Sequence, residues 1–293
     1  DLTFYNLSMS FIYGATVLSL YASYLTDSAV LLGFIPAIQS VFFFVPQLLM
    51  SRRAEQLPRK KPLLVKISIM ERLPYLFVAL SIFLLPEAPE WLTFSILAVS
   101  LAVATGSGGL GAPAWKAMLA KVIRVDRRGR MFGLSNAIGG ALGVLGGLLS
   151  RRVLATYAYP TSFGICFLLC FAGHALSYAS LCLNREPAEE IEPSNESTGE
   201  YLARLPRILD QNPNFARYLV SRGLSAFGTM GTTFYIVYAR DGFQIGDVFA
   251  ADLTMVALVS QIVLTPIIGW LADHRGNRWI LANSNWFGAA AII

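Results

Sequence analysis

The feature that most constrains this chain is a stretch of twenty residues, Leu253 to Ala272, that contains no charged side chain. A helix rises 1.5 Å per residue, so a stretch of this length crosses the roughly 30 Å hydrocarbon layer of a bilayer. The stretch runs directly into the polar sequence Asp273-His274-Arg275-Gly276-Asn277-Arg278, and a new apolar run opens at Trp279. The polar hexapeptide is therefore expected to be a short turn between two membrane-crossing helices.

Composition indicates that the rest of the chain also lies in a membrane. Of 293 residues 55% are hydrophobic and 14% are charged, so a soluble fold would expose far too much apolar surface. The net charge is +5, but most basic residues lie in short segments beside apolar runs. The expected partner of the chain is therefore the lipid bilayer, and nucleic-acid binding is not expected. The three cysteines, Cys166, Cys170 and Cys182, share one apolar run and are interpreted as packing residues.

The apolar runs predict an all-α, polytopic membrane protein in three parts. Helices are expected over residues 2–26, 28–50, 62–85, 91–120, 131–150, 160–183, 215–239 and 246–272, with an incomplete ninth helix from 279 to the end. Residues 1–183 then form an N-terminal six-helix bundle, residues 184–214 a cytoplasmic linker, and residues 215–293 the start of a C-terminal bundle. The chain begins without a methionine, stops inside an apolar run and shows no cleavable signal, so it is expected to be a fragment.

The charges of the loops predict the orientation. Basic residues gather after the second, fourth, sixth and eighth expected helices, whereas the other loops carry only Arg151, Arg152 and Arg240. Because basic loops are retained inside the cell, the N-terminus of this multi-pass cell-membrane protein is expected in the cytoplasm. The linker begins as an acidic, proline-containing piece, and its second part, residues 201–209, mixes leucine with arginine and is interpreted as a short helix along the membrane surface.

The turn after the eighth expected helix resembles a known motif. The sequence from Gly269 to Arg278 is similar to the G-x-L-A-D-R-x-G-R signature of the major facilitator superfamily, secondary transporters of small solutes. The resemblance implies two six-helix bundles that rock about a solute site at the midplane, and a conformational latch made by Asp273, Arg275 and Arg278, with Gly269 and Gly276 permitting close approach. In the alternative interpretation Asp273 only caps the next helix in a solvated turn.

A weaker internal repeat is consistent with two bundles. Ser40 and Pro46 are spaced like Ser260 and Pro266, and a basic turn follows each pair. The first-half copy of the signature should follow Pro46, but Gln47-Leu48-Leu49-Met50-Ser51-Arg52-Arg53 lacks both its glycine and its aspartate. Gating carried by that copy is therefore expected to be altered or lost.

Ionisable residues inside expected helices are candidates for coupling. Glu71 and Arg72 lie roughly 13 Å along the third helix from Pro62, where a charge needs a partner or water. Neighbours in a helix point about 100° apart, so the two need not pair with each other. Glu71 is interpreted as a protonatable coupling site and Arg72 as an anchor, or both as structural partners of other groups. Asp252 is interpreted either as a residue that contacts a solute or a gate, or as one whose side chain reaches the membrane–water interface.

The resemblance implies that helices 1, 4 and 7 line the central cavity. Polar and aromatic residues on them suit a solute with hydroxyl or ring character, although each fits packing equally well; they are Asn6, Tyr13, Ser107, Trp115, Thr232 and Tyr235. In helix 5, Gly139, Gly143 and Gly147 recur at every fourth residue. This strip is interpreted as a sliding or static surface against helix 8, which the resemblance places beside helix 5. The glycines of helix 4, residues 106–111, and Pro113 are expected to weaken that helix.

No pattern of an enzyme was found. His174 and His274 have no second ligand at metal spacing, and neither a phosphate-binding loop nor a nucleophile elbow occurs, so no metal, cofactor or catalytic residue is expected. A membrane enzyme would need acids or histidines clustered at one face. The function predicted is secondary active transport of a small-molecule solute by alternating access, with an ion such as the proton as the candidate coupling partner. The alternative is a membrane sensor or scaffold that keeps the fold without transport.

Overall fold

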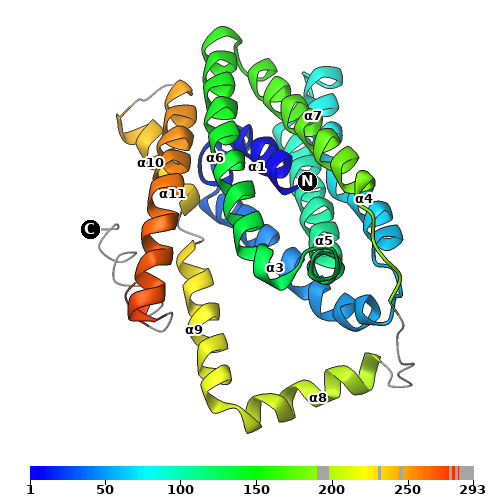
Figure 1. Ribbon diagram of the computed structural model, residues 1–293. Helices are drawn as coiled ribbons and strands as arrows, with labels where there is room; N and C mark the ends of the chain where they lie inside the picture. Colours follow the sequence, from blue (N-terminus) through cyan, green and yellow to red (C-terminus); the bar gives the residue numbers. More distant parts are fainter. Residues whose placement is uncertain (190–197, 230–231, 244–246, 277–278, 281–282, 284–293) are drawn as a thin grey trace.

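The computed structural model describes residues 1–189, 198–229, 232–243, 247–276, 279–280 and 283, and in this part every regular element is helical (Figure 1). The elements are α1 (Leu2–Ser10), η1 (Gly14–Leu18), α2 (Ser19–Leu25), α3 (Ala29–Glu55), α4 (Lys61–Leu84), α5 (Glu90–Val122), α6 (Val125–Thr156), α7 (Thr161–Leu183), α8 (Thr198–Gln211), α9 (Pro213–Thr229), α10 (Thr232–Phe243) and α11 (Val248–Arg275).

Six of the described helices contain a span long and apolar enough to cross a membrane: α3, α4, α5, α6, α7 and α11. Their outer surfaces expose large apolar side chains such as Val30, Phe44 and Phe77. Such a surface is stable in lipid, which solvates apolar side chains and leaves helices to satisfy their own backbone polar groups. The expectation of an all-α polytopic membrane protein is confirmed.

The first expected helix is broken. The α-helical part α1 ends at Ser10, Tyr13 has an extended backbone (φ −52°, ψ 126°), and the chain re-enters a helix through the π-helical segment η1 before α2. The prediction of one continuous helix over residues 2–26 is therefore wrong. Length and hydrophobicity do not reveal such a break, because all three pieces are apolar.

Hydroxyl groups support the broken segment. The Ser10 hydroxyl donates to the carbonyl of Leu7, and the Ser19 hydroxyl donates to the carbonyl of Gly14. The Thr16 hydroxyl is hydrogen-bonded to that of Thr254 on α11. Side-chain hydrogen bonds of this kind compensate for some of the regular helical bonds lost at the break.

The connections at residues 56–60, 123–124 and 184–189 meet at one end of the molecule, which we call the basic end. There the Nζ of Lys121 donates to the carbonyl of Pro58 (3.0 Å), and the backbone N–H of Glu189 donates to the same carbonyl (3.2 Å). The Glu186 carboxylate accepts hydrogen bonds from the backbone N–H groups of Lys60 (2.9 Å) and Lys61 (2.7 Å) at the start of α4. The expected linker thus begins with a segment fixed to α4 and α5, and it also contains the helix α8 (Figure 1).

Helix α6 packs between α1 and α11 (Figure 1), and glycines of α6 lie at both contacts. A side-chain carbon on Gly140 would lie 2.6 Å from Ile262, and one on Gly147 would lie 2.7 Å from Met255, both on α11. One on Gly139 would instead lie 2.8 Å from the Nδ2 of Asn6 on α1. The close packing of this helix on helix 8 is as expected, but the strip expected at every fourth residue is divided between two neighbours.

Candidate functional site

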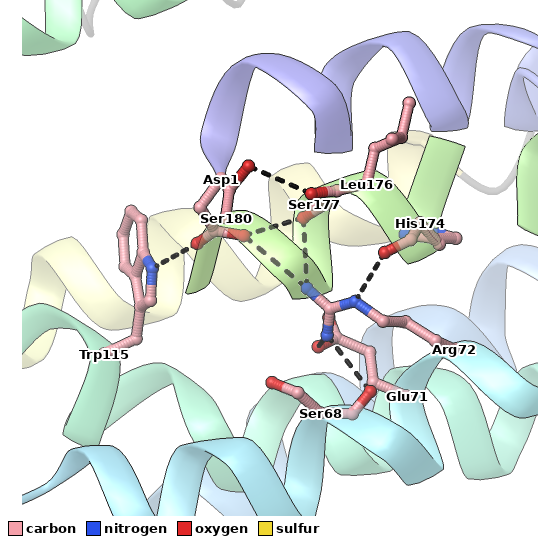
Figure 2. Close-up of polar contacts among 9 residues, drawn as sticks. All are labelled: Asp1, Ser68, Glu71, Arg72, Trp115, His174, Leu176, Ser177 and Ser180. Carbon is pink, nitrogen blue, oxygen red and sulfur yellow. Dashed lines mark hydrogen bonds and ion pairs between the residues drawn. The ribbon is translucent and has the colours of Figure 1, made fainter. Parts of the chain in front are cut away.

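A buried arginine organises the interior of the first helices. Arg72, on α4, has only 6% of its side chain exposed. Its Nε donates to the carbonyl of His174 (3.1 Å), its Nη1 to the carbonyl of Ser68 (3.1 Å) and its Nη2 to the Oγ of Ser177 (3.1 Å) (Figure 2). A guanidinium has five N–H donors and is costly to bury without acceptors, so these contacts explain how it is accommodated at this depth.

Two carboxylates complete the environment of Arg72. Its Nη1 lies 3.0 Å from the Oε2 of Glu71 and its Nη2 lies 3.5 Å from the Oδ1 of Asp1 (Figure 2). The adjacent residues Glu71 and Arg72 therefore do pair, because their long side chains converge from neighbouring positions. The Ser177 hydroxyl donates to the Oδ1 of Asp1 (2.7 Å), and the Nε1 of Trp115 on α5 donates to its Oδ2 (2.9 Å). We call Asp1, Glu71, Arg72, Trp115 and Ser177 the Arg72 cluster.

His174 contributes its backbone rather than its ring to this cluster. The imidazole is fully buried between the rings of Tyr5 (centroids 5.1 Å apart) and Tyr75 (4.9 Å). Neither ring nitrogen has a hydrogen-bond partner among the described residues. No group of three or more metal-ligating side chains occurs in the described part of the chain.

A cavity of about 220 Å³ adjoins the Arg72 cluster. It is lined by residues of α1, α3, α4, α5 and α7 together with Asp1, so it lies within the first six expected helices. Three of the residues singled out in the sequence, Glu71, Arg72 and Trp115, line it together. A mainly apolar cavity with a few convergent polar groups is the usual form of a small-molecule site.

The other expected cavity residues whose side chains are described do not line this space. Asn6 lies beside Gly139, Tyr13 lies at the break after α1, and Ser107 is buried within α5. Tyr235 has 52% of its surface exposed, and the side chain of Thr232 lies outside the described residues. The structure therefore brings Trp115 together with the expected coupling residues and leaves Asn6, Tyr13, Ser107 and Tyr235 apart.

A second set of polar contacts lies at the end opposite the basic end. The Nε of Arg151 on α6 donates to the Oδ1 of Asp252 on α11 (2.7 Å). The Tyr24 hydroxyl on α2 donates to the Oδ1 of Asp247 (2.6 Å), and the guanidinium of Arg240 lies over the Tyr24 ring, 5.0 Å from its centroid. We call these the opposite-end contacts. They join α2 and α6 to α10 and α11, and they give Asp252 a partner that the sequence did not suggest.

The family-level comparison agrees with this architecture. The family model described as Major Facilitator Superfamily matches residues 2–293. The chain belongs to the major facilitator superfamily. A comparison with curated proteins found no match. Proteins of the superfamily are transporters of small solutes rather than enzymes, and they are typically coupled to an ion, so the chain has a transporter-type function.

The superfamily signature coincides with the end of α11. The helix ends at Arg275, and Gly276 follows with a φ of +82°, a left-handed conformation that glycine adopts without strain and that commonly ends helices. The guanidinium of Arg275 lies 5.3 Å from the centroid of the Trp279 ring. Gly269 and Asp273 belong to α11, but the Asp273 side chain and all of Arg278 lie outside the described residues.

Several residues of the site were missed in the sequence. Asp1, Tyr5 and Ser177 line the cavity or bind Arg72, and His174 was considered only as a metal ligand. One signal was available: a buried arginine needs several acceptors, and apolar helices offer few apart from serines, acids and free carbonyls. That rule predicts the kind of partner but does not say which helix provides it.

Proposed function

We propose that this superfamily member is a secondary active transporter that moves a small solute by alternating access. In this proposal residues 1–183 form the first bundle, residues 184–214 connect the bundles, and residues 215–293 begin the second. The observation that supports it best is the set of opposite-end contacts, through which α2 and α6 meet α10 and α11. Partly exposed polar pairs contribute little stability, so such contacts can separate at small cost, which is what rocking requires.

The second gate of this mechanism is the turn after α11. Asp273, Arg275 and Arg278, with Gly269 and Gly276, are proposed to latch the bundles together at the basic end when the opposite end is open. In proteoliposomes carrying the purified protein, Asp273→Asn combined with Gly269→Val is expected to abolish gradient-driven solute accumulation. A matched control is Glu87→Gln, an exposed carboxylate between α4 and α5. Accumulation at the wild-type level in the double variant would defeat the latch.

Glu71 and Arg72 are proposed to couple transport to an ion, most simply the proton. Glu71 lines the cavity and is the one ionisable acid within the α4 span, so a change in its protonation alters the charge that faces the cavity. The same proposal places the N-terminus in the cytoplasm. Thiol labelling in cells tests this orientation with Arg53→Cys and Arg275→Cys, which are both exposed and are expected on the same, inner face.

A sensor or scaffold without transport is the second candidate. It is favoured by the first-half copy of the signature, which lacks the glycine and the aspartate. Arg52, in this copy at the end of α3, is buried, and neither of its Nη atoms has a hydrogen-bond partner among the described residues. Saturable solute binding without flux in either direction would favour this candidate over the transporter.

A further inference from the structure

The buried side chains of the Arg72 cluster include two acids and one base. Two carboxylates, those of Asp1 and Glu71, surround the single guanidinium of Arg72, and each of the two acids has 17% of its side chain exposed. A buried carboxylate is stable only when its charge is compensated, so both acids depend on this guanidinium. The charge of Arg72 is therefore already neutralised within the cluster and is not available to an anionic ligand.

One oxygen of the Glu71 carboxylate is free to accept a hydrogen bond from a ligand. The Oε2 of Glu71 binds Arg72, whereas its Oε1 has no hydrogen-bond partner among the described residues. This oxygen faces Gly108 on α5, where a side-chain carbon would lie 3.1 Å from it. The Arg72 guanidinium, in contrast, is already engaged by Ser68, His174, Ser177 and both acids. The cavity thus presents a carboxylate oxygen to a ligand, and no guanidinium group remains free for an anion.

The walls and size of the cavity define the rest of the ligand. The rings of Tyr5, Phe43 and Trp115 line it, and aromatic faces stabilise both apolar groups and cations. Its volume of about 220 Å³ is below that of pockets for drug-sized molecules, so the ligand is small. Lys116 also lines the cavity, but it is exposed and lies eight residues beyond Gly108 on α5, about 12 Å along the helix, so its charge is solvated at the mouth.

We infer that the cavity binds a small protonated amine with an aromatic or compact apolar body, its ammonium group on Glu71. The ammonium donates to the Oε1 of Glu71, and the ring packs against Trp115 and Phe43. The inference deepens the proposed function, because it names the solute class of the same site. Binding itself does not depend on transport.

The test is direct binding of matched probes to the purified protein in lipid nanodiscs, measured by isothermal titration calorimetry. Phenethylamine and 3-phenylpropionate have similar ring-bearing bodies and opposite charges. Saturable binding of the amine, tighter than that of the carboxylate, is expected. Absence of amine binding, or tighter binding of the carboxylate, would overturn the inference.

Three variants assign the binding to Glu71. Glu71→Gln is expected to weaken amine binding about tenfold or more, because it removes a buried charge partner, and Glu71→Asp is expected to retain more binding than Glu71→Gln. Glu87→Gln, in the loop before α5, is expected to bind like the wild type. If Glu71→Gln does not fold, Gly108→Ala tests the same assignment. Its added methyl group crowds the Oε1 of Glu71 and should also weaken amine binding. Unchanged affinity in the folded Glu71 or Gly108 variant would overturn the assignment.

Flux measurements separate this inference from the proposed function. Amine binding without amine flux would count against transport and leave the binding site standing. Gradient-driven flux of another solute by a protein that does not bind the amine would count against the inference alone.

Discussion

At the scale of single residues, Arg72 connects separate parts of the chain. Its partners are Asp1 at the start of α1, Glu71 on its own helix, and Ser177 and the carbonyl of His174 on α7. Removal of one partner from a buried charged network usually costs more than the network contributes, because an uncompensated charge remains behind. The contribution of Arg72 to stability is therefore best measured against a variant that removes the opposite charge as well.

Arg72→Ala is expected to destabilise the protein by about 3–5 kcal/mol, because Asp1 and Glu71 lose their counter-charge in a buried site. The double variant Arg72→Met with Glu71→Gln removes one charge of each sign, so it should lose less. The midpoint of thermal unfolding in detergent gives the order of the three proteins. Equal midpoints for the wild type and Arg72→Ala would show that the cluster does not stabilise the fold.

Gly109 tests close packing at a single position. A side-chain carbon there would overlap the backbone carbonyl oxygen of Phe43 on α3, which cannot move aside as a flexible side chain does. Gly109→Ala is therefore expected to cost about 1–3 kcal/mol, as overpacked cores do. Gly133→Ala on α6 is the matched control, since nothing lies within 4 Å of its added carbon, and it should be neutral or slightly stabilising. Thermal midpoints would contradict this if they fell equally for both.

At the scale of elements, the segment after α7 fixes the ends of α4 and α5. Glu186 is almost fully buried and binds the first backbone N–H groups of α4, while Glu189 pairs with Lys60 (3.2 Å) and Lys121 (2.7 Å). An acidic side chain at a helix N-terminus also interacts favourably with the helix dipole. The start of the linker therefore belongs with the first helices, and free movement can begin only beyond it.

The ion pairs of Glu189 predict a dependence on pH. Hydrogen bonds from Lys121 and then Lys60 hold the pKa of the Glu189 carboxyl below its usual value of 4.5. A lowered folded-state pKa means that the contribution is fully present above the unfolded value and is lost as the pH falls through the folded value. Glu189→Gln should therefore lower the thermal midpoint at neutral pH, and the difference from wild type should shrink below about pH 4.5. A difference that is the same at acid and neutral pH would exclude these pairs as its cause.

At the scale of the whole molecule, the contacts between the early and late helices differ along their length. The described contacts of α6 with α11 run from the pair of Arg151 with Asp252 to the packing of Gly140 on Ile262. The Tyr24 contact with Asp247 adds to the first of these two regions. Among the described residues, the opposite-end contacts are thus the part of this interface that holds charged side chains, and in the proposed mechanism they are the part that must open.

Charge exchange at Arg151 and Asp252 tests this. The pair is partly exposed, so it should contribute at most about 1 kcal/mol, equivalent to roughly a fivefold shift between closed and open states. With Ser23→Cys as a reporter beside Arg240, labelling by a membrane-impermeant thiol reagent should rise in Arg151→Gln. Exchange of the two charges, Arg151→Asp with Asp252→Arg, should restore slow labelling. Labelling that does not respond to any of these changes would show that the pair does not hold this end closed.

The prediction from sequence was most accurate where the physical signal is local. The spans α3 to α7 and α11 follow from length and hydrophobicity alone, and the bounds differ from those expected by no more than a few residues except at α6. The break after Ser10 gave no such signal, because Tyr13 and Gly14 are compatible with an apolar helix. The glycines and proline of α5, expected to weaken it, lie within a continuous helix because α3 and α4 pack along it.

The candidate site could be predicted only in part for the same reason. Glu71 and Arg72 stand out in sequence because a charge in a membrane helix is costly. Their partners Asp1 and Ser177 do not, since an acid near a chain end and a serine in an apolar helix are common. The sequence alone determined that this chain crosses a membrane as helices and carries the superfamily signature, because a bilayer imposes length, hydrophobicity and internal hydrogen bonding on every span. Only the tertiary structure decided which side chains meet. The partners of Arg72 at the start of α1 and on α7 are distant from it in sequence, and the contacts of α6 depend on which of its glycines faces α1 and which faces α11.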